Sequence, residues 1–178
     1  MLTFLIHSRT AWNDYFEGTF SPNLNSQTYT SRQNPSDTSV YVSNCLFGSI
    51  TSSSQGSALY CTSVTYFLIE STSFFTCKTS GNHYGTIYFQ NSGGQSVLYE
   101  VCAYDCCTTG GSYSHQFALI IVGNVAINKN YVNYSSISRC VSDKSDSWHI
   151  LGLSCGKTFC PSVNLSLNKC YHHSAIAC

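Results

Sequence analysis

Short segments in which apolar and polar residues alternate recur along the chain and predict β-strands. In one set, a residue expected to face inward stands three positions before a cysteine; these residues are Val42, Phe74, Ala103, Ile137 and Leu167. A second set of apolar segments covers 58–60, 86–88, 118–120, 150–152 and 175–177, and a third covers 65–69, 95–99 and 122–127. No segment has an apolar pattern at helical spacing over three turns. Because the segments fall into two or three sets, each repeat is expected to hold two or three strands.

The cysteines that close the first set are evenly spaced, at steps of 32, 29, 34 and 30 residues. They are Cys45, Cys77, Cys106, Cys140 and Cys170. A repeat of this length cannot bury its own apolar face, so neighbouring copies are expected to stack. Equivalent positions of stacked coils lie about 4.8 Å apart, which favours the same residue type at the same corner. The five cysteines are therefore predicted to form a structural ladder.

Three repeat architectures have short strands and similar periods: the propeller, the leucine-rich horseshoe and the parallel β-helix. Propeller blades need about 40 to 50 residues and four strands, and leucine-rich repeats need an L-x-x-L-x-L frame that this sequence lacks. We therefore predict an all-β solenoid, a parallel β-helix of about five coils of roughly 30 residues. It is expected to cover residues 39–178, and residues 1–38 are expected to form a partial coil or cap.

Two short motifs give the chain a resemblance to a known family. Gly56-Ser57-Ala58-Leu59 and, more loosely, Tyr84-Gly85-Thr86-Ile87 are similar to a G-G-A-I motif, and Phe74 and Leu167 each stand three residues before a cysteine. In these features the chain resembles the right-handed parallel β-helix surface proteins of parasitic protists, which are called Pmp-like after bacterial polymorphic outer-membrane proteins. The resemblance implies a right-handed coil, a cell-surface or extracellular location, and adhesion or antigen display. Its implied partners are host or extracellular glycans or proteins.

Composition narrows the function further. Charged residues make up only 9% of the 178 residues, and the eight Lys and Arg residues form no basic stripe, which argues against a nucleic-acid partner. No run of 18 apolar residues predicts a membrane span, and the apolar run Met1 to Ile6 is short for a secretion signal. Because the last apolar segment has no polar cap after it, the chain is expected to be a piece of a longer surface protein.

Eleven cysteines in a chain of this size indicate an oxidising compartment. Stacked positions have parallel Cβ vectors, which keep the Cβ atoms slightly too far apart for disulfides and favour free thiols in the ladder. Candidates for disulfide bridges are therefore the cysteines outside it: Cys61, Cys102, Cys107, Cys155, Cys160 and Cys178.

Candidate sites for chemistry are few, and we assign no catalytic residue, cofactor or metal. Zinc-type ligands gather at Cys170, His172, His173 and Cys178, with Cys155 and Cys160 nearby, but their spacing matches no zinc motif. The alternative function, a pectate-lyase-like polysaccharide lyase or hydrolase, needs converging carboxylates. The best such grouping is a cleft of Asp105, His115, Asp143 and His149.

Two surface features complete the predictions. The glycosylation sequons at Asn133 and Asn164 differ in parity: Asn164 is expected to face outward and Asn133 inward. Several tyrosines fall on predicted strands, either as half-buried strand residues or as an exposed stripe on which sugars stack. They are Tyr60, Tyr88, Tyr99 and Tyr104.

Overall fold

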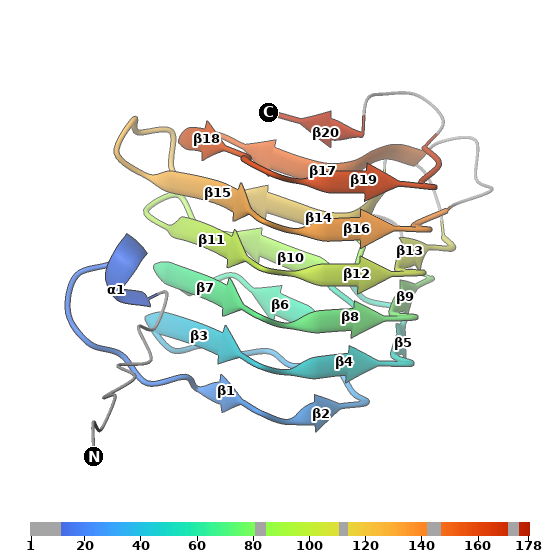
Figure 1. Cartoon of the computed structure of the whole chain (residues 1–178), viewed down its shortest axis with the longest axis horizontal. Coiled ribbons are helices and arrows are strands. Elements are labelled where there is room, and N and C mark those ends of the chain that lie inside the picture. Colours follow the sequence, from blue (N-terminus) through green and yellow to red (C-terminus); the bar gives the residue numbers. More distant parts are fainter. Residues whose placement is uncertain (1–11, 81–84, 111–113, 142–146, 171–174) are drawn as a thin grey trace, which may run out of the picture.

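The strands of this protein coil into a parallel β-solenoid. The computed structural model describes residues 12–80, 85–110, 114–141, 147–170 and 175–178. Every strand pairing in this part of the chain is parallel, as the stacking of repeats predicts. Figure 1 shows the turns stacked from the blue N-terminal end to the red C-terminal end. About four full turns lie between β3 and β18, and the predicted fold class is confirmed; the right hand of the coil stays a prediction.

Each turn passes through three sheets in the same order, which we number 1, 2 and 4; sheet 3 is a short additional sheet described below. Sheet 1 contains β1 (Leu24–Asn25), β3 (Ser39–Ser43), β7 (Tyr66–Glu70), β11 (Gln95–Tyr99), β15 (Lys129–Asn133) and β18 (Lys157–Phe159). Sheet 2 contains β2 (Thr28–Tyr29), β4 (Leu46–Gly48), β8 (Ser73–Phe75), β12 (Cys102–Tyr104), β16 (Ser136–Ser138) and β19 (Asn164–Ser166). Sheet 4 contains β6 (Leu59–Cys61), β10 (Ile87–Gln90), β14 (Ser114–Ile121), β17 (Ser147–Ser154) and β20 (Ile176–Ala177).

A short additional sheet lies between sheets 2 and 4 in three of the turns. Sheet 3 contains β5 (Thr51–Ser52), β9 (Lys78–Thr79) and β13 (Cys107–Thr108). The N-terminal region adds β1 and β2 to the stack and places the helix α1 (Trp12–Tyr15) on the outer face of sheet 1. There Trp12 and Phe16 pack against the outward side chains Tyr41, Leu68 and Val97. At these three positions sheet 1 is therefore buried on its outer face as well as on the inner face that lines the solenoid interior.

One predicted strand is wrong. Residues 122–127 form a connection rather than a strand, and Val125 and Ile127 are exposed to solvent. The chain turns here through hydrogen bonds from Val125 N to the Gly123 carbonyl and from Asn128 N to the Val125 carbonyl. The strand that pairs with β11 is β15, which begins at Lys129, because stacking on the turn below decides which residues enter the sheet. A prediction from apolar content alone therefore placed this strand at residues 122–127 and not at β15.

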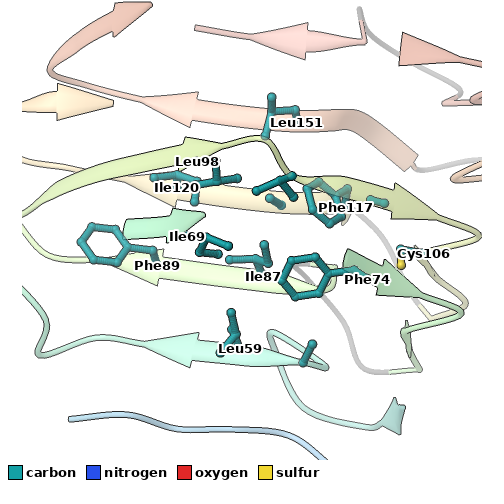
Figure 2. Close-up of a cluster of buried hydrophobic side chains, with 14 of the residues drawn as sticks. Leu59, Ile69, Phe74, Ile87, Phe89, Leu98, Cys106, Phe117, Ile120 and Leu151 are labelled. Atoms are coloured by element: carbon teal, nitrogen blue, oxygen red, sulfur yellow. The ribbon is translucent and has the colours of Figure 1, made fainter. Parts of the chain in front are cut away.

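The interior is built from rows of identical or similar side chains. The Phe47 and Phe74 rings stack at 5.0 Å between centroids, and Tyr29 stacks on Phe47 from the turn below. Phe67 and Phe89 stack at 5.2 Å across the interior, from sheets 1 and 4. Figure 2 shows Phe74, Phe117 and Ile87 pointing into the same buried cluster. Vertical register therefore produces the continuous core that no single repeat can form.

The solenoid turns at two rows of corners in which residues other than glycine adopt positive φ. The first corner, between sheets 1 and 2, is formed by Ser26, Asn44, Ser71, Glu100, Tyr134 and Ser162. The second corner follows sheet 2 and is formed by Ser49, Thr76, Asp105, Arg139 and Leu167. Left-handed backbone costs a non-glycine residue about 1 to 2 kcal/mol, so its recurrence marks a bend that the stack imposes on every turn.

The cysteine ladder needs a correction at both ends. Because Phe47 pairs with Phe74, the residue that stacks on Cys77 is Ile50, and Cys45 lies one corner earlier, beside Thr72. The ladder contains Cys77, Cys106 and Cys140. At its C-terminal end the equivalent residue is Asn168, whose side chain accepts a hydrogen bond from Cys140 N, so Cys170 falls two residues beyond the row.

The corner geometry explains why cysteine recurs. The Cys45, Cys106 and Cys140 thiols each donate to the carbonyl two residues earlier, at 3.2, 3.5 and 3.7 Å. At the same place after the first corner, Thr72 Oγ1 and Ser135 Oγ donate to the carbonyls of Glu70 and Asn133. A small inward side chain with a donor therefore satisfies a carbonyl that the bend leaves buried. This geometry accounts for the corner cysteines Cys45, Cys77, Cys106 and Cys140, and the oxidising compartment stays a prediction.

Candidate functional site

The structure brings together only part of the cleft considered for the enzyme alternative. His115 in β14 and His149 in β17 are neighbours, with 5.3 Å between their ring centroids. Asp105 lies at the second corner, where its Oδ2 is 3.1 Å from Lys78 Nζ, so this carboxylate belongs to a surface ion pair. Asp143 lies outside the described residues. Two histidines thus share a pocket, and in the described part of the chain no Asp or Glu side chain lines it.

The histidine pocket is a hollow of about 300 Å³ on the outer face of sheet 4. Its lining includes His115, Leu119, Trp148, His149, Gly152 and Cys178. The His115 ring lies directly over Gly152, where an added Cβ would be 2.4 Å from the ring. A β-bulge in the pairing of β14 with β17 places the ring there, and this irregularity cannot be read from apolar periodicity.

The charge state of His115 argues against a role as a general base near neutral pH. Burial, and secondarily the neighbouring His149, lowers the pKa of His115 to about 4. The ring is therefore neutral at pH 7 and accepts a proton only in acid. A general base works best with a pKa near the working pH, and His115 is far below it.

We expect this buried histidine to make stability fall in acid. The unfolded chain binds a proton on His115 near pH 6.5, whereas the folded protein does so only near pH 4, so stability is lost as pH falls through that window. Between pH 8 and pH 5 the histidine should lower the free energy of unfolding by about 2 kcal/mol. Urea denaturation at the two pH values measures this loss.

The variant His115→Leu isolates the effect, because only the difference between the two pH values is compared. We expect its loss between pH 8 and pH 5 to be about 2 kcal/mol smaller than that of the unaltered protein. His83→Gln, which removes a histidine elsewhere in the chain, serves as the control and should keep the full loss. Equal pH dependence in all three proteins would contradict the assignment.

The structure gives no support to a zinc site. Within the residues described, no three His, Cys, Asp or Glu side chains converge as metal ligands would. His172 and His173 lie outside the described residues. Burial raises the pKa of the Cys61 thiol to about 12 and raises that of Cys140 as well, so both are protonated at neutral pH. Protonated, buried thiols are poor ligands and poor nucleophiles.

The two sequons differ as predicted in accessibility, but for a different reason. Asn164 is exposed on the outer face of β19, where its Nδ2 donates to Ser136 Oγ at 3.3 Å. Asn133 also has outward parity, so the predicted inward orientation is wrong. It is buried because the N-terminal region covers it, with Asn133 Nδ2 donating to Tyr15 Oη at 2.6 Å. Of the two, Asn164 is the one whose side chain a glycan can reach.

Of the two alternatives for the tyrosines, the exposed stripe does not form as one surface: Tyr60 and Tyr99 are half-buried and Tyr88 is buried. Tyr60 and Tyr88 stack on each other on sheet 4, and Tyr99 lies on sheet 1 against Tyr15. Tyr104 lies on sheet 2, where it stacks on Phe75 with 5.5 Å between centroids and 7° between ring planes. The exposed fractions of these two rings are 39% and 50%.

Phe75 and Tyr104 form one wall of a groove on the outer face of sheet 2. The groove has a volume of about 290 Å³. Its lining also includes Leu46, Ser73, Cys102, Ser136 and Ser138. None of the residues of the six strands of sheet 2 is charged. Sequence reasoning missed Phe75 because Phe74 and Phe75 read together as one apolar pair, although a strand turns one inward and the other outward. We call this surface the sheet 2 groove.

Comparisons with known proteins add no relative to this picture. No family model, no curated protein and no solved structure matches the chain. The relationship to Pmp-like surface proteins therefore stays a prediction. Among the described residues, none of the helical structure is long and apolar enough to cross a membrane.

Proposed function

We propose that this protein is a non-enzymatic β-solenoid of the cell surface or extracellular space that binds extracellular glycans or proteins through a flat outer face. The observation that carries the proposal is the sheet 2 groove, in which exposed aromatic rings and serine hydroxyls lie on strands without charged residues. Binding sites generally combine apolar lining with a few placed polar groups, and this groove has that composition.

The distribution of carboxylates supports this proposal over a carbohydrate-active enzyme. Glycoside hydrolysis uses two carboxyl groups that flank one bond, at most about 10 Å apart. In the described part of the chain, Glu70 accepts a hydrogen bond from Tyr41, Glu100 accepts one from Ser71 at 2.8 Å, and Asp105 pairs with Lys78. None of these carboxylates lines the sheet 2 groove or the histidine pocket.

A binding assay combined with a product assay tests the proposal. The purified protein is applied to an array of neutral and charged glycans and of extracellular-matrix proteins, and the bound fraction is measured. Pectin and related polysaccharides are incubated with the same preparation, and reducing ends and unsaturated products are measured. We expect saturable binding without product. Catalytic release of product from any of these polysaccharides would contradict the non-enzymatic assignment, and an absence of binding to every probe would contradict the binding role.

A further inference from the structure

One outward row of sheet 2 forms a stack of side chains parallel to the solenoid axis. The strand register places Gly48, Phe75, Tyr104, Ser138 and Ser166 above one another in consecutive turns. Phe75 and Tyr104 fill two consecutive positions with nearly parallel rings. Successive positions are about 4.8 Å apart, so each ring occupies one turn of the solenoid.

The two ends of this stack differ. On the C-terminal side, the Arg139 guanidinium carbon lies 5.6 Å from the centre of the Tyr104 ring and covers it in a cation–π contact. On the N-terminal side, the next position is Gly48, where an added Cβ would meet nothing within 4 Å. Phe75 therefore has no ring or guanidinium beneath it in this row, and half of its side chain is exposed. The stack is one ring short at Gly48.

One apolar and one polar residue flank the vacant position. Leu46 stands on the same strand as Gly48, and Ser73 stands beside Phe75 in the parallel outward row. Farther along the groove are Ser136, which accepts a hydrogen bond from Asn164, and Ser138. An occupant of the vacancy thus meets the face of Phe75, with the Ser73 hydroxyl and the Leu46 side chain beside it, while Ser136 and Ser138 lie beyond Tyr104.

We propose that a pyranose ring of a neutral extended glycan binds in the vacancy at Gly48 and stacks its apolar C–H face on Phe75. This inference rests on the proposed function and specifies its ligand class and its contact site. A sugar ring matches the site because it carries an apolar face and hydroxyl groups at its edge, as the groove carries an aromatic face and serine hydroxyls. A charged glycan or a highly charged peptide finds no complementary charge on these strands.

Two substitutions test the site from opposite directions. Gly48→Phe fills the vacancy with a ring of the protein's own, at a position without positive φ and with open space above it, and should leave the melting temperature unchanged or higher. Phe75→Ser removes the stacking surface. Gly48→Ala and Phe159→Ser are the matched controls: alanine leaves most of the space open, and Phe159 is a ring of sheet 1 with a similar exposed fraction of 52%.

The measurement is binding to immobilised cellohexaose, laminarihexaose, mannohexaose and chitohexaose. We expect Gly48→Phe and Phe75→Ser each to weaken binding by about tenfold or more, and both controls to stay within about twofold of the unaltered protein. Unchanged binding by Gly48→Phe and Phe75→Ser would overturn the inference and leave the proposed function standing, because the glycan would bind another face. If the unaltered protein binds none of the four hexasaccharides but binds charged glycans or proteins on the array, the inference is overturned and the proposed function stands. If it binds neither the hexasaccharides nor any probe on the array, both are overturned. If Gly48→Phe loses binding to a protein probe and no hexasaccharide binds, the vacancy is occupied by a protein side chain. This result would overturn the proposal that a glycan binds there.

Discussion

Gly85→Ala is expected to lower the free energy of unfolding by more than about 3 kcal/mol, at the upper end of what overpacking costs. A Cβ at Gly85 would be 2.0 Å from the carbonyl oxygen of Gln116 and 2.8 Å from that of His115, in the turn above. Both contacts are with backbone, so no side chain rotation relieves them. Gly85 N also donates to the His115 carbonyl at 2.8 Å and its carbonyl accepts from Ser57 N at 3.0 Å, so the glycine is held between two turns.

Gly93→Ala provides the matched control for this substitution. At Gly93 an added Cβ meets only Asn91 Oδ1, at 3.7 Å, which is an ordinary van der Waals distance. We expect this variant to change the free energy of unfolding by less than about 0.5 kcal/mol. Urea denaturation monitored by circular dichroism compares the two. Similar losses in both variants would mean that adjacent turns are not in close contact at Gly85.

Gly85 also shows that a motif recognised by resemblance can have a physical cause that the sequence does not reveal. It belongs to the segment that resembles the G-G-A-I motif, and the register places it beside Ser57 of the other copy of that motif. At Gly85 the motif has a physical cause, because the backbone of the next turn approaches so closely that a side chain there does not fit. This cause is visible only once the stacking of turns is known.

The repeat could be predicted from the sequence, because stacking favours similar residues at equivalent positions. The alignment of the turn that contains Cys45 with the next turn could not be predicted. Asn44-Cys45 and Thr76-Cys77 share the same local form, a residue with positive φ followed by an inward thiol. They lie at different corners, however, and only the pairing of Phe47 with Phe74 distinguishes them. Two corners with the same local chemistry make an alignment on cysteine ambiguous. The middle of the ladder was correct, since Cys77, Cys106 and Cys140 all follow the second corner.

This ambiguity also concealed the candidate binding site. An alignment on Cys45 places Ser43 beside Phe75, whereas the strand register places Gly48 there. The vacancy at Gly48 is thus a property of the register between turns and of no local motif. The histidine pair was partly predictable, because His115 and His149 fall in adjacent copies, but the bulge that turns the His115 ring over Gly152 was not.

Phe74→Ala is expected to lower the free energy of unfolding by about 3 to 5 kcal/mol, the usual cost of removing a buried phenylalanine ring. Phe74 is 1% exposed, stacks on Phe47 at 5.0 Å and contacts the edge of Phe117 at 5.7 Å, as Figure 2 allows the reader to follow. Its removal opens a cavity in the interior between two turns. The surrounding strands cannot close it, because their spacing is set by the hydrogen bonds of the stack.

The neighbouring residue supplies a control of identical chemistry. Phe75→Ala removes the same ring one position later on β8, where it faces outward and loses only its contact with Tyr104 and partial burial, so we expect a loss of about 1 kcal/mol. Urea denaturation of both variants under the same conditions gives the comparison. Equal losses, or a larger loss for Phe75→Ala, would mean that β8 presents the opposite face to the interior. Because a shift of one residue exchanges the two faces of a strand, this pair of variants tests which face of β8 enters the core and which faces outward to form the sheet 2 groove.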